Sequence, residues 1–534
     1  MDAASNAADI VIIGAGSAGA TLAARLSEDP HRQVTILEAG IDDRSLWRRI
    51  PVGYFKMVGN ARFDWKFQTE PEPHLDDRRI ACPRGRVLGG TSAINGMLYL
   101  RGHQADYDRW ERDGNEGWSW QNVMPYFKRA MNQARGESAM HATGGPLTVS
   151  NLAIDELSQA FIDSCVASGL PRTDDFNLGS NEGAGPYQIT TRRGERASTD
   201  RAYLREAMAR PNLHVITGAH TRRILFDKTR VAGVEFIRNG QIETVRTRHE
   251  VVVCAGAIQS PQILQLSGIG PTALLNTHGI APLVSLPGVG RNLQDHFQAR
   301  LFHRVNQPIT GNDIWHSPWR RMREGLRYLV KRDGFLANGI CRAGAFYRSH
   351  PSVPWPDIQA HFGILSIDNP AVPPHPHSGM TLSVCLLRPD SRGSIEIQSK
   401  DPMMAPLIRM NYLASAADQT AMIRAVRRIR EIAATAPLAR YSNGEFQPGP
   451  AAQSDAELLA FLRAKGTTIF HPSGTCKMGA DPMGVIDDCL RVYGVEGLRV
   501  ADASIMPHIV SGNTNAPAIM IGEKAADLIK ETMR

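Results

Sequence analysis

Hydrophobic and polar positions near the start of the chain predict a strand, a helix and a second strand. Residues 10–13 are all apolar, which is typical of a parallel strand buried on both faces. Residues 20–26 have helical character, and residues 34–38 form a second short apolar run that ends in Glu38. The sequence therefore predicts a β-α-β unit at the N-terminus.

Three further patterns lie in the second half of the chain. Residues 388–397 are predicted to form a turn that leads into an alternating strand, and residues 417–433 an amphipathic helix with arginines on its outer face. Residues 319–332 place five apolar side chains at helical spacing among basic ones. One interpretation is a solvated helix over a substrate domain; the alternative is a membrane-surface helix, which would suit a dehydrogenase that passes electrons to quinones. The five apolar residues are Trp319, Met322, Leu326, Leu329 and Val330.

A glycine-rich loop joins the first predicted strand to the helix, with Gly14, Gly16 and Gly19 in the spacing of a dinucleotide site. The first glycine permits a tight turn, the second lets backbone N–H groups approach a pyrophosphate, and the third allows close packing of helix on strand. Glu38 follows where a carboxylate would accept hydrogen bonds from a ribose. An acid there disfavours a 2′-phosphate, so FAD or NAD fits better than NADP. The alternative is a glycine-rich turn without a ligand.

Composition places the chain among globular proteins with more than one domain. It has 534 residues, of which 42% are hydrophobic and 21% charged, and a net charge of +7 that is small for this length. The basic excess is not concentrated, so we expect no nucleic-acid partner. Residues 1–9 lack the features of a signal peptide, and no run approaches the ~20 apolar residues of a membrane span. Seven cysteines without a Cys-x-x-Cys pair predict reduced thiols and a cytoplasmic location.

Two other segments carry candidate chemistry. Residues 84–98 form a second small-residue turn, in which Gly89-Gly90 would let the backbone approach a flat ring system. Near the C-terminus, His471 begins the block His-Pro-Ser-Gly-Thr-Cys, and Asn513 follows about forty residues later. A histidine titrates near pH ~6.5 and suits a general base. An asparagine beside it could hold the same substrate oxygen without titrating.

These blocks and several others, in order, make the chain resemble the glucose–methanol–choline (GMC) family of flavin-dependent alcohol oxidoreductases, nearest to its choline-, aliphatic-alcohol- and sorbose-dehydrogenase-like branch. The other blocks include residues 117–120, 254–271, 288–296 and 388–393. The resemblance implies an α/β, two-domain fold (α+β in its arrangement), like that of p-hydroxybenzoate hydroxylase. A Rossmann-like FAD-binding domain would comprise residues 1–150, 190–295 and 465–534. A substrate-binding domain, an antiparallel sheet covered by helices, would comprise residues 151–190 and 296–464.

The resemblance also implies a set of FAD-binding residues. They are Gly14, Gly16, Ser17, Ala18, Gly19, Glu38, Ala39, Arg86, Gly90, Ser92, Asn95, Gly96, Met97, Leu98, Thr221, Ala255, Gly256, Asp502, Ala503, Asn513 and Thr514. Asp502 could instead simply cap the turn that follows it. Some relatives attach FAD through a histidine that would fall at position 94, where this chain has Ile94. We therefore expect a non-covalent flavin.

His471 matches the catalytic histidine of the family, and Asn513 the second catalytic position. The implied reaction is oxidation of a primary alcohol or polyol to an aldehyde or ketone, by proton transfer to a base and hydride transfer to flavin N5. A dehydrogenase is favoured over an oxidase, with a quinone, an electron carrier or oxygen as acceptor. Alternatives are a lyase that keeps the flavin as a structural part, and a flavin-binding protein without activity. The identity of the alcohol, the oligomeric state and peripheral contact with the inner membrane are left open.

Other candidate residues are interpreted as structural. His375 and His377 could form a metal pair, but no third ligand is evident nearby, so we expect a polar loop and no metal site. Asp295 and His296 are taken as a structural part of their block. Cys476 is expected to be a small buried thiol and not a redox group.

Overall fold

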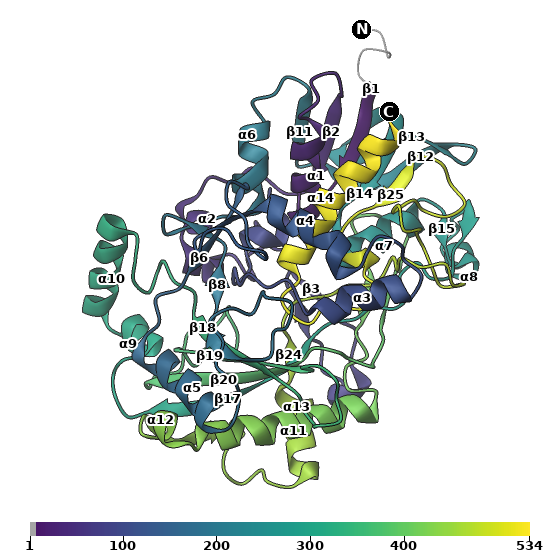
Figure 1. Ribbon diagram of the computed structural model, residues 1–534. Coiled ribbons are helices and arrows are strands. Elements are labelled where there is room, and N and C mark those ends of the chain that lie inside the picture. The colour runs from purple at the N-terminus through teal and green to yellow at the C-terminus, as the bar shows by residue number, and fades with distance from the viewer. Residues whose placement is uncertain (1–6, 534) are drawn as a thin grey trace.

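The computed structural model describes residues 7–533, which contain two seven-stranded β-sheets and several smaller ones. Helices pack against both large sheets. Figure 1 shows the first sheet at the top with both ends of the chain, and the second sheet below it. Each sheet has its own cluster of buried apolar side chains. The chain passes between the two halves several times, so residues far apart in sequence meet where the halves face each other.

The first sheet is mixed, with the N-terminal strand at its centre. The predicted strand, helix and second strand are confirmed as β1, α1 and β2, and β1 pairs in parallel with both β2 and β14. The antiparallel strands β13 and β12 extend the sheet beyond β14. In spatial order the strands are β11 (Leu213–Thr217), β2 (Val34–Glu38), β1 (Ala7–Ile13), β14 (Gln241–Val253), β13 (Arg230–Arg238) and β12 (His220–Asp227), with β25 (Leu498–Val500) beside β14.

The last helix of the chain packs directly against the first one. In Figure 1, α14 (Asn515–Thr532), in yellow, runs beside α1 (Ser17–Leu26). The approach is so close that a β-carbon on Gly522 would lie 2.5 Å from the carbonyl oxygen of Ala18. The buried carboxylate of Glu523 pairs with Arg25 of α1 at 2.9 Å. This packing holds the C-terminal segment beside the N-terminal glycine loop.

The second sheet is antiparallel throughout. Its strands are β23 (Ser442–Gln447), β17 (Phe297–Val305), β20 (Gly379–Leu386), β19 (Ile358–Gly363), β18 (Cys341–Tyr347) and β7 (Gly183–Pro186), with β24 (Thr467–Thr468) beside β17. One face buries alternate apolar residues against α5 (Glu156–Ala167) and α11 (Ala416–Ala433). The other face carries polar side chains and is turned toward the first half of the molecule.

The predicted elements of this half are present. Helix α11 matches the predicted amphipathic helix, and its Arg424 and Arg427 are exposed. The alternating strand is confirmed as the short β21 (Ser394–Glu396). The remaining helices that Figure 1 labels are α2 (Leu46–Arg49), α3 (Gln104–Arg112), α4 (Trp120–Ala130), α6 (Arg205–Ala207), α7 (Gly256–Leu266), α8 (Thr272–Thr277), α9 (Gly311–His316), α10 (Pro318–Lys331), α12 (Ala436–Ala439) and α13 (Asp455–Lys465). The predicted domain boundaries stay a prediction.

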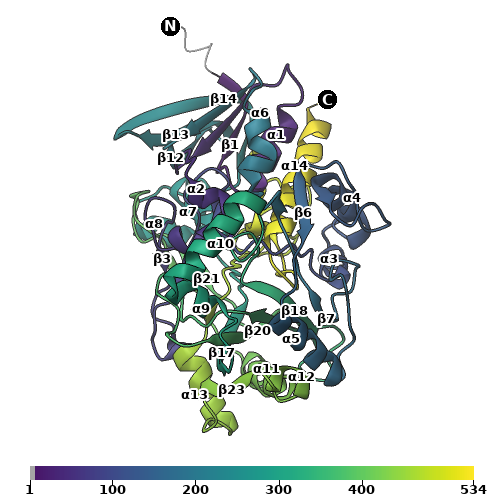
Figure 2. The ribbon, with the colours of Figure 1, turned by 90° about the vertical axis from the view of Figure 1, so that its left-hand side faces the viewer.

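Helix α10 lies on the outside of the molecule (Figure 2). The five apolar side chains of its predicted stripe are exposed to solvent. Trp319 is 69% exposed and Val330 73% exposed, whereas Glu324 and Tyr328 are the buried side chains on the inner face. Tyr328 packs against Ile50 in the segment before η1 (Pro51–Lys56). Within residues 7–533, no helix combines the length and apolar character needed to cross a bilayer.

Candidate active site

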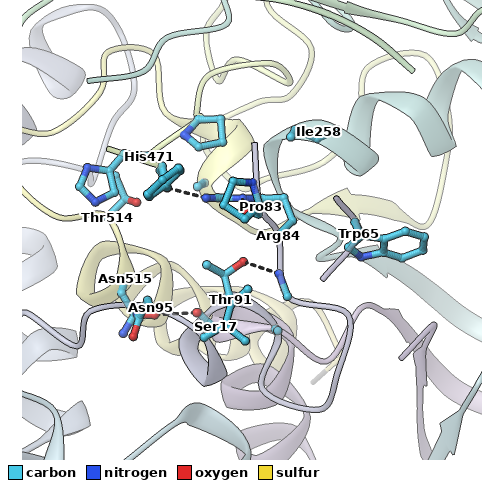
Figure 3. Close-up of a pocket in the computed structure, with 18 of the residues that line it drawn as sticks. Ser17, Trp65, Pro83, Arg84, Thr91, Asn95, Ile258, His471, Thr514 and Asn515 are labelled. Carbon is cyan, nitrogen blue, oxygen red and sulfur yellow. Dashed lines mark hydrogen bonds between the residues drawn. The ribbon is translucent and has the colours of Figure 1, made fainter. Parts of the chain in front are cut away.

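A cavity of about 390 Å³ lies between the two halves, and most of the predicted site residues line it (Figure 3). It runs from the glycine loop of the first sheet to the polar face of the second sheet. Ser17 and Asn515 are joined by a 2.7 Å hydrogen bond at one side, and His471 lies across the cavity from them. The predicted residues that line the cavity are Gly14, Gly16, Ser17, Ala18, Glu38, Ala39, Gly90, Asn95, Gly96, Met97, Leu98, Thr221, Ala255, Gly256, His471, Asp502, Ala503, Asn513 and Thr514.

The glycines form a cradle with room for a ligand. A β-carbon added at Gly16, Gly96 or Gly256 would meet no other atom within 4 Å, so each of these glycines borders open space in the cavity wall. At Gly90, by contrast, a β-carbon would lie 2.7 Å from the α-carbon of Gly16, and its φ of +51° favours glycine. The two glycine turns therefore contact each other and present bare backbone to the cavity. This arrangement fits a dinucleotide such as FAD.

Two buried carboxylates lie in the same part of the wall. Glu38 accepts hydrogen bonds from the backbone N–H groups of Ala15 (2.9 Å) and Gly40 (2.7 Å), and burial raises its pKa to about 7. Asp502 accepts from the N–H groups of Gly256 and Ser504, so it caps the turn that follows it, and it also lines the cavity. Each carboxylate has further lone pairs for ligand hydroxyl groups.

Three of the predicted FAD residues lie outside the cavity wall. Gly19 is a packing position, where a β-carbon would lie 1.9 Å from the carbonyl oxygen of Gly14. Arg86 stacks its guanidinium over the ring of Trp65 at 4.8 Å. The hydroxyl of Ser92 donates to the carbonyl of Gly89 at 2.6 Å. All three support the turns that form the wall.

His471 belongs to a chain of hydrogen bonds that determines which ring nitrogen carries its proton. The Nε2 of His296 lies 3.2 Å from the carbonyl oxygen of Leu387, which can only accept, so this nitrogen carries a hydrogen. The Nδ1 of neutral His296 must then accept, and it lies 3.0 Å from Nδ1 of His471. His471 therefore carries its hydrogen on Nδ1, and its Nε2 is unprotonated with one lone pair. That lone pair faces the side-chain nitrogen of Asn513 at 3.1 Å.

Burial keeps both imidazoles neutral. It lowers the pKa of His296 to about 4. Burial, the neighbouring His296 and the positive charge of Arg84 together hold the pKa of His471 well below its usual value. A neutral ring with a free Nε2 can accept a proton. His296 was interpreted as structural from the sequence; its contact with His471 shows that it also orients the candidate base.

Neighbouring side chains fix the orientation of the pair. Gln359 donates to the side-chain oxygen of Asn513 at 3.5 Å, which leaves the amide nitrogen of Asn513 turned toward His471. Asp295 accepts the backbone N–H of His471 at 2.7 Å and the hydroxyls of Thr468 and Tyr412. The Asp295-His296 block thus supports both the backbone and the ring of His471.

The other candidates from the sequence have structural surroundings. The rings of His375 and His377 pack edge-on against Phe446 in a loop. Cys476 is completely buried, and burial raises the pKa of its thiol well above the usual value. All seven cysteines lie within residues 7–533, and none of them forms a disulfide.

Sequence reasoning missed the part of the wall that the second sheet contributes. Gln298, Arg300, His361 and Ser383 point into the cavity from β17, β19 and β20. Arg84 also lines the cavity and donates to the backbone carbonyl of Phe470 at 2.6 Å, next to His471 (Figure 3). Alternation along the strands identifies one polar face, but the sequence alone does not reveal that this face meets His471.

Comparison with known proteins decides the family. The N-terminal GMC oxidoreductase model matches residues 8–298, and the C-terminal GMC oxidoreductase model matches residues 389–522. The chain belongs to the GMC oxidoreductase family. It is accordingly an FAD-dependent oxidoreductase that acts on CH–OH groups, as the resemblance implied, and its two-sheet α/β fold is the fold of this family.

Individual relatives cover nearly the whole of this GMC oxidoreductase. It is 44% identical over 533 residues to an oxygen-dependent choline dehydrogenase of Burkholderia cenocepacia (strain HI2424), covering 98% of this chain and 93% of that protein. Among solved structures, it is similar to pyridoxine 4-oxidase from Mesorbium loti, with 31% identity and a TM-score of 0.89 over 98% of this chain and 99% of that one. An FAD-dependent oxidoreductase from Chaetomium thermophilum is 26% identical, with a TM-score of 0.91 over 99% and 100% of the two chains.

Proposed function

We propose that this GMC oxidoreductase oxidises an alcohol with His471 as general base and Asn513 as its partner, using a non-covalently bound FAD. The observation that carries the proposal is the hydrogen-bond chain that leaves Nε2 of His471 unprotonated beside the amide of Asn513. When bound in the cradle, FAD supplies the acceptor for the hydride that leaves the alcohol carbon. The cradle would be formed by the lining residues of the two glycine turns together with Glu38 and Asp502.

The proton of the alcohol is transferred to a defined atom. An alcohol oxygen within hydrogen-bond reach of both His471 and Asn513 would donate its hydrogen to the Nε2 lone pair of His471. His296 holds the opposite side of the ring, so the imidazole keeps its orientation while it accepts the proton. General-base catalysis of this kind typically contributes about 10²–10⁴ in rate.

Asn513 stabilises the negative charge that develops on the alcohol oxygen. One N–H of its side-chain nitrogen donates to Nε2 of His471 in the structure; when the alcohol hydrogen takes that place, the amide N–H groups are available to the alcohol oxygen. Because an amide does not titrate, it provides this bond without competing for the proton. Gln359 holds the amide oxygen at 3.5 Å and so maintains the required orientation.

A non-covalent flavin and a dehydrogenase activity are the more specific parts of the proposal. Ile94 lines the cavity and has no nucleophilic atom with which to attach a flavin. The name of the relatives, oxygen-dependent choline dehydrogenase, supports the dehydrogenation of an alcohol, makes choline one of the first alcohols to test, and makes oxygen an acceptor to compare with quinones. Denaturation with acid should release all of the flavin into the supernatant, and flavin left on the precipitated protein would refute non-covalent binding.

The activity itself is tested by mixing the flavin-loaded protein anaerobically with a panel of primary alcohols and polyols. We expect at least one alcohol to bleach the flavin absorbance, and the reduced protein to react faster with a quinone analogue than with oxygen. A flavin that no alcohol in the panel bleaches would favour the lyase or the purely binding alternative. Faster reoxidation by oxygen would identify an oxidase.

We also propose that α10 binds the surface of an anionic membrane. Its exposed apolar stripe is flanked by basic side chains, so it combines an apolar face with positive charge that complements anionic phospholipid headgroups. Tyr328 of α10 packs against the segment before η1. Tyr54 and Phe55 of η1 line the cavity. Membrane contact through α10 would therefore hold the cavity close to a lipid-soluble electron acceptor. The basic residues are Arg320, Arg321, Arg323, Arg327, Lys331 and Arg332.

Co-sedimentation with vesicles tests this contact. Near an anionic surface each basic residue contributes about 1 kcal/mol, so removing three should weaken binding roughly a hundredfold. We expect the triple variant Arg321→Glu, Arg323→Glu, Lys331→Glu to remain in the supernatant with phosphatidylglycerol vesicles that sediment the wild type. Arg424→Glu on α11, also exposed, is the matched control and should bind as the wild type does. Wild-type protein that does not sediment with these vesicles would refute the proposal.

A further inference from the structure

Three side chains of the second sheet form a row across the cavity wall. Arg300 on β17 is directly opposite Ser383 on β20, and Ser383 is directly opposite His361 on β19. All three line the cavity. Since opposite residues of neighbouring antiparallel strands point to the same face, their side chains lie side by side. None of the three has a role in the proton transfer described above.

The guanidinium of Arg300 is largely unpaired. Its one side-chain hydrogen bond goes to the backbone carbonyl of Asp368 at 2.8 Å. Among residues 7–533, it has no carboxylate as a hydrogen-bond partner, because Asp368 accepts through its backbone carbonyl. A guanidinium has five N–H donors in a fixed fork, which matches the geometry of a carboxylate. Most of these donors are therefore available to a ligand.

His361 is also without a partner. Its side chain is 3% exposed, and neither ring nitrogen forms a hydrogen bond with any described residue. Buried polar groups in proteins nearly always have a hydrogen-bond partner, so the ring nitrogens of His361 are available to a ligand in the cavity. Burial lowers the pKa of His361 to about 3, so the ring is neutral and offers one N–H donor.

No carboxylate of the described residues lines this end of the cavity, and Asp368, the one whose charge acts on Arg300, is exposed outside the lining. The carboxylates that line the cavity within residues 7–533 are Glu38 and Asp502, and backbone N–H groups already hold both in the nucleotide cradle. A quaternary ammonium in front of the second sheet would find no counter-charge and would face the positive charge of Arg300. An anionic group would instead find a charged fork and a neutral N–H donor.

We infer that Arg300 and His361 form a subsite for a carboxylate on the alcohol, so that the substrate is a small hydroxy acid. The inference rests on the proposed function. The distance between the subsite and the catalytic pair limits the size of this substrate. Gln359 contacts Asn513, and His361 lies two residues further along β19, which is about 7 Å. The hydroxyl and carboxylate groups are therefore separated by only a few carbons. This class differs in charge from choline, the substrate in the names of the relatives.

The test compares matched compounds on the flavin-loaded protein. Binding of propanoate, which has no hydroxyl, is measured by the perturbation of the flavin spectrum, with tetramethylammonium as the cationic comparison. Rates of flavin reduction are measured with 3-hydroxypropanoate, its uncharged amide and choline. The variants are Arg300→Gln, Arg300→Lys and, as a control on the same strand, the exposed Arg304→Gln.

We expect propanoate to bind at least tenfold more tightly than tetramethylammonium. Arg300→Gln should weaken propanoate binding by about 10- to 150-fold, because a hydrogen bond to a charged group contributes a free energy of that size. Arg300→Lys should recover part of this loss, and Arg304→Gln should change little. The uncharged amide should lose much less than 3-hydroxypropanoate does in Arg300→Gln. Propanoate binding that is unchanged in Arg300→Gln, or choline as the best substrate, would overturn the inference. If no alcohol reduces the flavin, the proposed function fails, but propanoate binding still tests the subsite.

Discussion

Replacement of His296 by leucine removes the acceptor that holds the proton of His471 on Nδ1. In the wild type, Nδ1 of His471 donates to Nδ1 of His296 at 3.0 Å, and both side chains are buried. In the variant, the tautomer with hydrogen on Nδ1 would contain a buried N–H without a partner. The other tautomer would place the hydrogen on Nε2, where the substrate proton has to go.

The magnitude of the effect follows from the burial of the pair. A buried donor without a partner costs about 1–3 kcal/mol, which shifts the tautomer ratio by roughly 5- to 150-fold toward the unreactive form. Only the fraction with an unprotonated Nε2 can accept the proton, so the rate of flavin reduction should fall by up to the same factor. FAD binding should be unchanged, because His296 does not line the cavity.

Anaerobic stopped-flow measurement of flavin reduction provides the assay. His296→Asn is the matched control, because its amide oxygen can still accept a hydrogen bond, and it should lose less activity than His296→Leu. Rates within about twofold of wild type in His296→Leu, measured at saturating alcohol, would refute the tautomer argument. Equal losses in both variants would show that the ring of His296 acts by packing alone.

Two further predictions follow from the site. Because the pKa of His471 lies well below its usual value of 6.5, the ring stays neutral as the pH falls through that value. The rate of flavin reduction should therefore decline only at lower pH. A half-maximal rate at or above pH 6.5 would contradict this prediction. At Gly90, a valine side chain would collide with Gly16, so Gly90→Val should purify with little flavin by its absorbance ratio. Gly325→Ala, at a helical glycine where a β-carbon would meet no atom within 4 Å, should retain a full complement.

Local signals in the sequence predicted the nucleotide half of the site. Strand, glycine turn, helix and terminal acid follow one another within residues 10–38, so their spacing alone indicates the cradle. His471 and Asn513 were found because short blocks surround them. Arg300 and His361 lie in strands without such blocks, and only the register of three strands brings them together. His296 was interpreted as structural because its contact with His471 joins residues 175 positions apart, and no local pattern in the sequence indicates such a contact. For α10, periodicity predicted the helix but not that its apolar side faces outward.

The most direct test of the central claim is the rate at which an alcohol reduces the flavin in His471→Ala. The variant lacks the Nε2 atom that accepts the proton, while the glycine turns that hold FAD are unaltered. The account predicts a full flavin content and a reduction rate at least about 10²-fold below that of the wild type, the lower end of the range for loss of a general base. A reduction rate within about threefold of wild type, with the flavin still bound, would contradict it.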